Sequence, residues 1–303
     1  MTVGDGVGTG KVFHYVNGKY DLHQRVYRCF GFSKEVSAKY FYYYFSKNFY
    51  DRVMSMTAKT SVDSVRYEMI SDMDFALPKI EEQNKIVCIL NGLDNLITLH
   101  QSKCDKLVSI KKSLLKKMFP KNNKNIPEIR FKGFTEAWEQ RKLKEISTIQ
   151  AGGDIDNSKI SESGKYPVIA NALTKDGIVG YYNDEYRIKA PAVTVTGRGN
   201  IGHAQARMID FTPVVRLLAL NTKHDVNFIA NAINTKRIIV ESTGVPQLTV
   251  PQLENYEIKV TSEKEENKIG EFFIKLDNLI TLHQSKLEKL KTIKKTLLNK
   301  MFV

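Results

Sequence analysis

The side chains best suited to chemistry in this sequence are hydrogen-bonding groups that follow a glycine-rich turn at residues 197–200. Polar residues continue beyond the turn at alternate positions, and a second glycine-rich stretch near residues 4–10 is followed by Lys11 and His14. Arg, Lys, Asn and Gln on loops are suited to reading base edges in DNA, and glycines let a backbone approach the duplex closely. Two interpretations of this pattern stay open: contact with DNA, and an ordinary polar surface hairpin. The candidate DNA-contacting residues are Arg198, Asn200, His203, Gln205, Arg207, Lys11 and His14.

Two short motifs resemble catalytic or phosphate-binding sites, but the residues around them do not fit. A phosphate-binding loop within Thr2–Val12 would need Gly where Asp5 stands and Ser or Thr where Val12 stands. Glu257-Ile258-Lys259 resembles part of a nuclease site, but no Pro-Asp precedes it. The sequence contains no Pro-Pro dipeptide, so the Asn/Asp-Pro-Pro-Tyr site of amino-methyltransferases is absent. We therefore predict a chain without catalytic residues.

An exact internal repeat organises the chain. The eleven residues Leu93–Lys103 return unchanged as Leu276–Lys286, an offset of 183 positions. The match extends outward at the same offset, so that Met118-Phe119 corresponds to Met301-Phe302. A match of this length at one fixed offset indicates a duplication.

Both copies of the repeat carry apolar residues at alternating spacings of four and three, which is the heptad pattern of a coiled coil. No Pro interrupts either copy, so each is predicted to form one helix of roughly 35–40 residues, about 55 Å long at 1.5 Å per residue. Two helices with matching seams are expected to pack on each other. The predicted seam residues are Ile86, Leu90, Leu93, Ile97, Leu107, Leu114, Ile269, Phe273, Leu276, Ile280, Leu290 and Leu297.

Polar residues interrupt the two seams at equivalent positions. His100 corresponds to His283, and Lys111 corresponds to Lys294. Polar seam residues fix register and orientation at some cost in stability, and this structural role is favoured here. A role of the histidines as metal ligands or proton relays is the alternative. It is disfavoured because no Cys, Asp or second His completes a matching ligand set in both copies, and no metal site is predicted.

The composition favours an anionic partner. The formal net charge of the 303 residues is +13, which points to nucleic acid first and a membrane surface second, although a basic soluble protein would look similar. The three cysteines (Cys29, Cys88 and Cys104) form no CxxC pair, as expected for reduced thiols in a cytosolic protein. No apolar run reaches membrane-spanning length and the start is not a signal peptide, so a cytoplasmic location is expected.

Globular segments precede each predicted helix. The expected domains are a first lobe at 1–78, a helix at 79–120, a linker at 121–126, a second lobe at 127–261 and a helix at 262–303. Residue patterns predict strands at Lys11–Tyr15, Arg25–Phe32, Tyr166–Ala170, Ile178–Tyr182, Ala192–Thr196 and Val214–Ala219, and helices at Lys34–Met56, capped by Ser33, and Asn227–Thr235. An aromatic face on the first of these helices is expected to be core rather than a stacking surface for bases.

The predicted fold class is α+β: two β-rich lobes separated by two long antiparallel coiled-coil helices, with a pseudo-twofold internal repeat. The first lobe matches only the later part of the second and has no counterpart of about sixty residues that open it. We therefore expect the chain to be truncated at its amino terminus or to begin at an internal start.

These features together resemble a known family. The second lobe opens with Pro127-Glu128-Ile129-Arg130-Phe131 and Trp138-Glu139-Gln140-Arg141-Lys142, and each lobe leads into a long helix of the repeated type. This arrangement, over nearly the whole chain, is similar to the specificity (S) subunit of Type I restriction–modification systems. The helices and the opening segment are specific to that family, whereas the lobe interiors are not.

The resemblance implies a function in DNA recognition. Each lobe would be a target-recognition domain that reads one half of a bipartite double-stranded DNA site. The helices would set the gap between the half-sites and dock two modification (M) subunits, which bind S-adenosylmethionine and methylate adenine. Restriction (R) subunits would add ATP- and Mg-dependent translocation and cleavage. The chain itself would bind no cofactor and would be no enzyme.

Two other interpretations remain open. The chain is a defective or half-type subunit that acts by pairing with another chain, or it is a coiled-coil scaffold that does not read DNA. A pure scaffold would not need a large, diverged lobe between its helices, which favours recognition. An intact second lobe and helix favour the survival of half-site reading.

Overall fold

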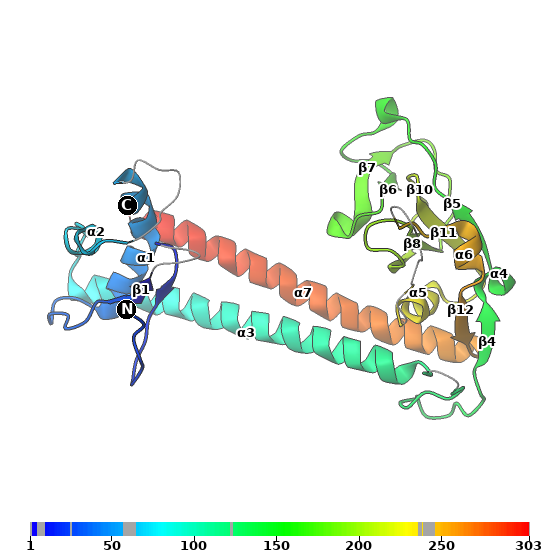
Figure 1. Ribbon diagram of the computed structural model, residues 1–303, viewed down its shortest axis with the longest axis horizontal. Coiled ribbons are helices and arrows are strands. Elements are labelled where there is room, and N and C mark those ends of the chain that lie inside the picture. The colour runs from blue at the N-terminus through cyan, green and yellow to red at the C-terminus, as the bar shows by residue number, and fades with distance from the viewer. Residues whose placement is uncertain are drawn as a thin grey trace. The chain divides into compact units, whose positions relative to one another are not determined.

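Two long helices are the largest elements of the fold. Helices α3 (Ile80–Met118) and α7 (Glu263–Met301) each contain 39 residues, within the predicted range (Figure 1). Acidic residues occupy the first turn of each and lysines the last, which complements the helix dipole. The structure is a computed structural model, and it describes residues 2–4, 10–24, 26–56, 65–121, 124–235, 238 and 246–302.

All the predicted seam residues are buried or half-buried, while apolar residues beside the seam, such as Leu96 and Leu279, are nearly half exposed. The predicted heptad register therefore agrees with the burial pattern along both helices. Where the helices meet, residue numbers rise along α3 as they fall along α7. Asp94 contacts Lys294, and His100 contacts His283, so the two helices are antiparallel.

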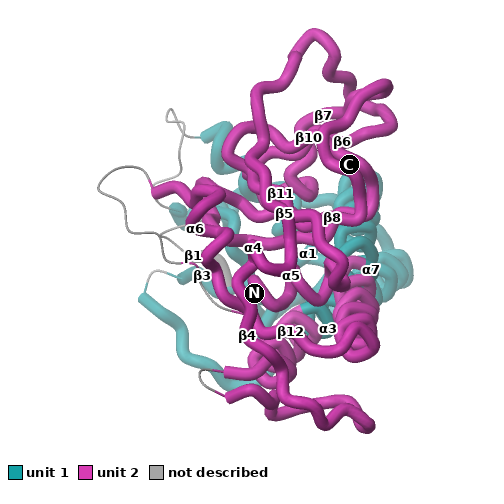
Figure 2. The backbone as a smooth tube through the Cα atoms, turned by 90° about the vertical axis from the view of Figure 1, so that its right-hand side faces the viewer, with its two compact units in different colours: residues 1–104, 282–303 teal, residues 105–281 magenta. Residues whose placement is uncertain are grey.

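The chain divides into two compact units, shown in different colours in Figure 2. Unit 1 comprises residues 1–104 and 282–303, and unit 2 comprises residues 105–281. Each unit therefore combines one lobe with part of both long helices, so neither helix forms a domain of its own. The boundaries expected from sequence placed whole helices between the lobes.

Unit 1 is built around helix α1 (Ala38–Ser55), whose buried face includes Tyr40, Tyr43 and Phe49. The aromatic residues of this face pack on one another and on Phe302 at the end of the second repeat. The prediction that Ser33 caps this helix is wrong, because the cap is Ser37, whose hydroxyl accepts a hydrogen bond from the Tyr40 amide. The other elements of the unit are α2 (Tyr67–Ser71) and the strands β1 (Thr2–Gly4), β2 (Phe13–His14) and β3 (Val26–Arg28).

Unit 2 contains most of the sheet structure. Its strands are β4 (Glu139–Lys142), β5 (Ser147–Ala151), β6 (Tyr166–Ile169), β7 (Ile178–Tyr182), β8 (Ala192–Thr196), β9 (Ala204–Arg207), β10 (Thr212–Pro213), β11 (Leu217–Thr222) and β12 (Glu257–Val260). An antiparallel sheet has the order β5-β11-β8-β9, a second sheet has the order β10-β6-β7, and β12 pairs with β4. Short helices complete the unit: α4 (Leu143–Ile146), α5 (Val226–Asn234), α6 (Val250–Glu254), η1 (Asn157–Lys159) and η2 (Thr174–Gly177).

A single large core joins the second lobe to its portions of the long helices. The apolar faces of β8, β9 and β11 pack with α5, the start of α7 and the end of α3. Helix α5 packs on the β8–β9 edge of the sheet, and its N-terminus is capped by the Asp225 carboxylate, which accepts from the Phe228 amide at 2.7 Å. The β9 strand is thereby held at the edge of the sheet by its pairing with β8 and its packing on α5.

Most of the predicted elements are present with small shifts at their ends. Strands β7 and β8 have the predicted bounds, and β6 and α5 differ by one residue at their ends. The strand predicted at Val214–Ala219 begins instead at Leu217, because Arg216 adopts a positive φ of 70° that extended structure does not allow. Residues 5–9 of the first glycine-rich stretch and Arg25 of a predicted strand lie outside the described residues.

The fold confirms the predicted α+β class with its internal repeat. In the described part of the first lobe the strands have only two or three residues, and α1 supplies most of the regular structure. None of the helices within the described ranges has the length and apolar character that crossing a membrane requires.

Candidate nucleic-acid interface

The predicted turn lies between strands β8 and β9. Arg198 and Asn200 are exposed at its tip. Gly199 has a positive φ of 73° and open space around it, so its backbone remains accessible. Gly197 has a different role: a Cβ there would lie 2.2 Å from the Arg216 carbonyl oxygen, so this glycine allows the chain to pack against itself rather than against a ligand.

Strand β9 arranges the other candidates on one face. His203, Gln205 and Arg207 occupy alternate positions, while Ala204 and Ala206 between them face the core. The Arg207 Nε donates to the Thr194 hydroxyl at 3.0 Å, and the Gln205 amide donates to the Asp176 carboxylate at 3.2 Å. These bonds hold two long side chains in place, while His203 remains exposed.

Charged groups of both signs lie next to this strand. Burial lowers the pKa of Arg207 to about 10, so its guanidinium stays charged at neutral pH. Although His203 is exposed on the strand, its ring is partly desolvated by its neighbours, and this desolvation, with the nearby charges of Arg207 and of Lys111 on α3, lowers its pKa. The strand face and the helix thus place Arg207 and Lys111 near the His203 ring, with Asp176 beside Arg207 and Asp277 paired with Lys111. The cluster offers hydrogen-bond donors and acceptors to a ligand.

Two features of this region were not found in the sequence analysis. The first is the turn that contains Lys175, Asp176 and Gly177, where three successive residues have positive φ angles of 50°, 54° and 76°. The Asp-Gly dipeptide is a turn signal, but only the structure shows that Asp176 accepts the hydrogen bond from Gln205. Such backbone conformations are costly for residues other than glycine and often occur at binding sites.

The second feature is a cleft of about 640 Å³ beside the predicted turn, lined in part by Arg198, Arg216 and Asn171. Asn171 contributes to the structure of the cleft, because its side chain accepts from the Gly197 amide at 2.8 Å and donates to the Val215 carbonyl at 3.2 Å. The two arginines give the cleft a positive charge. Arg216 was not a candidate because nothing in its local sequence distinguishes it.

The candidates of the first lobe lie on or near strand β2. His14 is exposed on this strand. Lys11 is also exposed, and its ammonium group lies 4.1 Å from the centre of the Tyr50 ring on α1, a cation–π contact. The structure therefore brings Lys11 next to the aromatic helix, and it places neither residue in a cluster like that of β9.

The polar seam residues meet in pairs. In unit 1 the Nδ1 atoms of His100 and His283 are 2.9 Å apart, so one ring donates to the other. Across the described ranges no group of three or more His, Cys, Asp or Glu side chains is positioned to hold a metal ion. This arrangement fits the structural role of the histidines that the sequence favoured.

Equivalent ion pairs flank the histidines in the sequence. Lys294 lies 2.5 Å from Asp94 in unit 1, and Lys111 lies 2.5 Å from Asp277 in unit 2. Asp94 and Asp277 occupy equivalent positions in the two repeats, and so do Lys111 and Lys294. Each ion pair therefore joins the aspartate of one repeat to the lysine of the other. This reciprocal pattern is that of a twofold, isologous interface.

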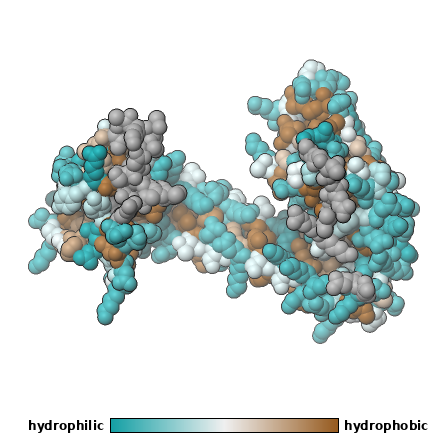
Figure 3. Space-filling model, viewed as in Figure 1, coloured by the Kyte–Doolittle hydropathy of each residue, from teal (hydrophilic) through white to brown (hydrophobic). Residues whose placement is uncertain are grey.

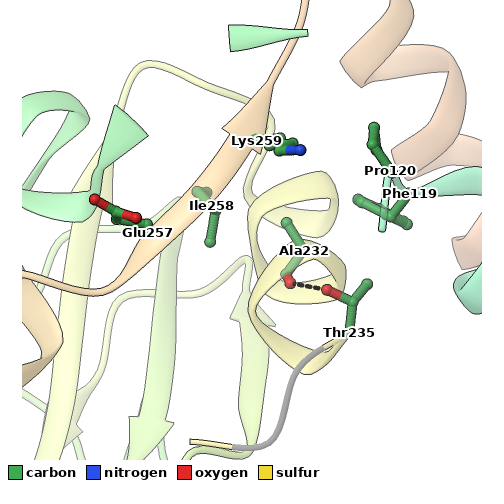
Figure 4. A pocket seen from close by; sticks show the side chains of 7 residues that line it. All are labelled: Phe119, Pro120, Ala232, Thr235, Glu257, Ile258 and Lys259. Carbon is green, nitrogen blue, oxygen red and sulfur yellow. Dashed lines mark hydrogen bonds between the residues drawn. The ribbon is translucent and has the colours of Figure 1, made fainter. Parts of the chain in front are cut away.

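The nuclease-like Glu257 and Lys259 lie on β12 in a structural setting (Figure 4). Lys259 is buried and its ammonium group donates to the Lys124 carbonyl oxygen. Glu257 accepts from the Gln140 amide on the neighbouring strand at 2.5 Å. Phe119 and Pro120, at the end of α3, line the same small pocket, so the strand serves to join the lobe to the helix.

Comparison with known proteins gives one family. The family model described as Type I restriction modification DNA specificity domain matches residues 1–108 and 135–292. A protein of Mycoplasma pneumoniae named as a type I specificity subunit is 25% identical over 269 residues, which cover 87% of this chain and 70% of that protein. The specificity subunit of the type I restriction enzyme MjaVIII from Methanocaldococcus jannaschii is 25% identical over 280 residues, covering 81% of this chain and 65% of that protein.

Solved structures share the fold. The S subunit of a Type I restriction–modification system from M. genitalium superposes with a TM-score of 0.66 at 18% identity, covering 89% of this chain and 73% of that one. A chain from a structure described as the complex assembly and conformational transition of the type I R-M system gives a TM-score of 0.56 at 14% identity, covering 88% and 71%. This chain thus spans about two thirds to three quarters of the length of these relatives.

Proposed function

We propose that this chain, which belongs to the family of Type I restriction modification DNA specificity domains, acts as a DNA-reading specificity subunit. The observation that carries the proposal is the β9 face, where Gln205, Arg207 and His203 lie beside Lys111. Arg and Gln side chains read purine edges in the major groove, and lysines contact phosphates. The turn residues Arg198 and Asn200 would add contacts from the same hairpin.

The two lobes would read different halves of a bipartite site. Their sequences and their secondary structures differ, whereas the helices that carry them are repeats. Lys11 and His14 remain the candidates for reading by the first lobe. The reciprocal pairs Lys294–Asp94 and Lys111–Asp277 support a twofold relation of the helices, which would present the lobes to DNA in equivalent ways. The helices would then set the gap between the half-sites.

Exposed apolar residues beside the seam support docking of two modification subunits. Leu96 and Ile293 in unit 1, and Ile110 and Leu279 in unit 2, each precede a seam residue and are 40 to 48% exposed. Leu96 is equivalent to Leu279, and Ile110 to Ile293, so the two patches have matching composition. Figure 3 shows apolar surface along the long helices. A repeated patch fits two copies of one partner better than two different partners.

Catalysis would belong to the partners. Modification subunits would supply S-adenosylmethionine and transfer its methyl group, and restriction subunits would use ATP and Mg for translocation and cleavage. This chain would bind no cofactor and contribute recognition and assembly only. The structural roles of Lys259 and Glu257 in joining β12 to its neighbours support this division.

Methylation mapping tests the proposal directly. The chain would be co-expressed with a cognate modification subunit, and methylated adenines would be mapped across the host genome. We expect a bipartite motif with a fixed gap. Arg207→Ala should relax one position of the half-site, since a bidentate contact is worth about 1–3 kcal/mol of base discrimination, while Arg141→Ala on the exposed strand β4 should not. A stable complex that methylates nothing, or a motif unaffected by Arg207→Ala, would contradict the assignment.

The role of the long helices in setting the gap and the docking patches need separate tests. Insertion of one helical turn into α3 and α7, about 5.4 Å, should lengthen the gap by roughly one or two base pairs of about 3.4 Å. An unchanged gap would contradict the proposal that the helices set it.

Leu96→Asp with Leu279→Asp should abolish capture of the modification subunit. Val108→Lys is the control, because Val108 is also exposed and its equivalent, Lys291, is already a lysine.

A half-type subunit that acts by pairing of chains is the second candidate. It would give methylation at a symmetrical motif built from two copies of one half-site. A scaffold without DNA reading gives the polar cluster on β9 no role, so the fold does not favour it.

A further inference from the structure

An arm of unit 2 covers the start of its long helix, and its contacts identify a matching surface in unit 1. The arm comprises residues 124–142. Its last four residues form β4, which pairs with β12 so that Glu139 lies opposite Val260. The Arg130 guanidinium makes two hydrogen bonds of 2.7 Å to the Glu265 carboxylate, which is fully buried.

Aromatic contacts complete the attachment of this arm. The Phe131 ring packs on Phe272 with centroids 5.9 Å apart, and the Lys268 ammonium lies 5.0 Å from the centre of the Phe131 ring. Trp138 is buried against Phe119 and Phe228. The arm is therefore held on the first turns of α7 and the strand before it by a strand pairing, a buried ion pair and the Phe131–Phe272 contact. Trp138 anchors it separately, on α5 and on the residue that follows α3.

Unit 1 carries the counterparts of these acceptor residues, displaced by the repeat offset of 183. Leu77 corresponds to Val260, Glu82 to Glu265, Lys85 to Lys268 and Ile89 to Phe272. Both the acid and the lysine are kept, and the aromatic is replaced by another apolar side chain. The acceptor surface for such an arm is therefore present twice in the chain.

These counterparts are exposed. Leu77 is 45% and Ile89 is 48% exposed, whereas Val260 is 6% exposed. Glu82 is exposed, whereas Glu265 is fully buried. Residues 74–77, which correspond to β12, form no strand, and no described strand of unit 1 pairs with them.

A cleft of about 400 Å³ lies at the place where the arm's strand would begin. It is lined by Leu77 and Pro78, by the first residues of α3, and by Lys34 and Glu35. In unit 2 the corresponding position beside Val260 is taken by β4. The Ala76 carbonyl of this segment accepts a hydrogen bond from the Tyr40 hydroxyl at 3.0 Å, but no described strand lies along it. A segment of this kind, next to an exposed apolar residue and a cleft, is a suitable site for strand addition.

We propose that unit 1 binds a second peptide segment of this kind. The occupant would carry an Arg-Phe-x-Gly-Phe segment followed by a β-strand, the chemistry of residues 130–142. Its arginine pairs with Glu82, its phenylalanine packs on Ile89 under the Lys85 ammonium, and its strand pairs with residues 74–77. This inference rests on the internal repeat and not on the proposed reading of DNA.

The test uses the full chain and a synthetic peptide with the sequence of residues 124–142, labelled with a fluorophore and followed by anisotropy. We expect saturable binding of one peptide per chain. Glu82→Arg in the chain should weaken binding at least tenfold, and a peptide with Arg130→Glu should recover part of that loss. Ile89→Asp should also weaken binding. Glu68→Arg, a reversal of another exposed acid in unit 1, is the matched control and should leave binding unchanged.

A second measurement separates this surface from the arm's own site in unit 2. A peptide with a photo-crosslinking side chain in place of Phe131 should label residues near Lys85 and Ile89. Labelling near Lys268 and Phe272 instead would mean that the peptide exchanges with the arm of unit 2, and would overturn the proposal. Absence of binding, or binding that Glu82→Arg does not change, would overturn it as well. None of these outcomes depends on DNA or on modification subunits.

Discussion

The two long helices begin with the same kind of buried anchor but with different chemistry. Gln83 near the start of α3 and Glu266 near the start of α7 are equivalent positions, and both are fully buried. The Gln83 amide accepts from the Ser37 N–H and donates to the carbonyls of Glu35 and Pro78, each at 2.8 Å. The Glu266 carboxylate is 2.8 Å from the His224 Nδ1 and accepts from the Thr261 amide at 3.1 Å.

The residue five positions before each anchor differs in a way that matches the difference in the anchor. Pro78 and Thr261 are equivalent, but proline has no N–H to donate. In unit 1 the Gln83 amide group donates a hydrogen bond to the Pro78 carbonyl. In unit 2 the Glu266 carboxylate accepts a hydrogen bond from the Thr261 N–H. The same attachment between lobe and helix is thus neutral in unit 1 and ionisable in unit 2.

The largest expected difference between the units concerns the arm of unit 2. Arg130→Ala should lower the free energy of unfolding of unit 2 by about 3–5 kcal/mol, because it leaves the buried Glu265 carboxylate without its partner. Hydrogen exchange of the α5 amides measures this. Glu82→Ala, the equivalent acid in unit 1, is exposed and should change stability by less than about 0.5 kcal/mol. Equal effects would break the comparison.

The next difference concerns a helical glycine. A Cβ at Gly270 would lie 2.1 Å from an Asp225 carboxylate oxygen that caps α5. Gly270→Ala should therefore destabilise unit 2 by about 1–3 kcal/mol through overpacking, despite the better helix propensity of alanine. The equivalent Val87 is half-buried, and Val87→Ala should cost less than Gly270→Ala when both are measured by urea denaturation. A stabilising Gly270→Ala would show that Asp225 moves freely.

The reciprocal ion pairs provide a smaller difference. Double-mutant cycles to Ala should give a coupling of about 0.2–1 kcal/mol for Lys111–Asp277, which is partly exposed. The coupling for Lys294–Asp94 should be larger, because Asp94 also accepts from the Tyr43 hydroxyl at 2.7 Å and Lys294 lies 5.5 Å from the centre of that ring. Tyr43→Phe should reduce the coupling of the second pair only. Equal couplings in both units would contradict the prediction that Tyr43 strengthens the Lys294–Asp94 pair.

The smallest expected difference is in pH dependence. Burial raises the pKa of Glu266, against the opposing hydrogen bond from His224. Because the pKa of Glu266 is higher in the folded than in the unfolded protein, its protonated form stabilises the fold. This contribution is complete below the unfolded pKa of about 4.3 and is lost as pH rises through the folded pKa. Glu266→Gln, the residue of unit 1, should flatten the stability of α5 over that range, by less than the limit of about 1.4 kcal/mol per pH unit for one proton. An unchanged slope in hydrogen-exchange stability would assign the titration elsewhere.

The long elements could be predicted because their signals are local and repeated. The heptad spacing gave both helices and their seams, and alternation gave strands such as β7 and β8. The cap of α1 could not be predicted, because Ser33 and Ser37 have equal propensity and only the tertiary contact of the Ser37 N–H with Gln83 distinguishes them. Among the candidate DNA-contacting residues, the sequence singled out His203, Gln205 and Arg207, and the structure adds that they lie along one face of β9. The sequence did not single out Arg216 or Asp176.

By itself, the sequence determined the duplication, the heptad register and the family resemblance, because each depends on residue types at fixed spacings along the chain. The tertiary structure decided which polar residues are buried and which charges meet. Gln83, Glu265 and Glu266 are residue types that ordinarily lie on helix surfaces, yet all three are fully buried. Their hydrogen bonds and ion pairs are made in part with lobe segments that are distant in sequence. The physical reason is that burial and ion pairing depend on distances between elements, which local periodicity does not encode. Only the two copies of the acceptor surface, covered in unit 2 and exposed in unit 1, show where an additional arm would bind.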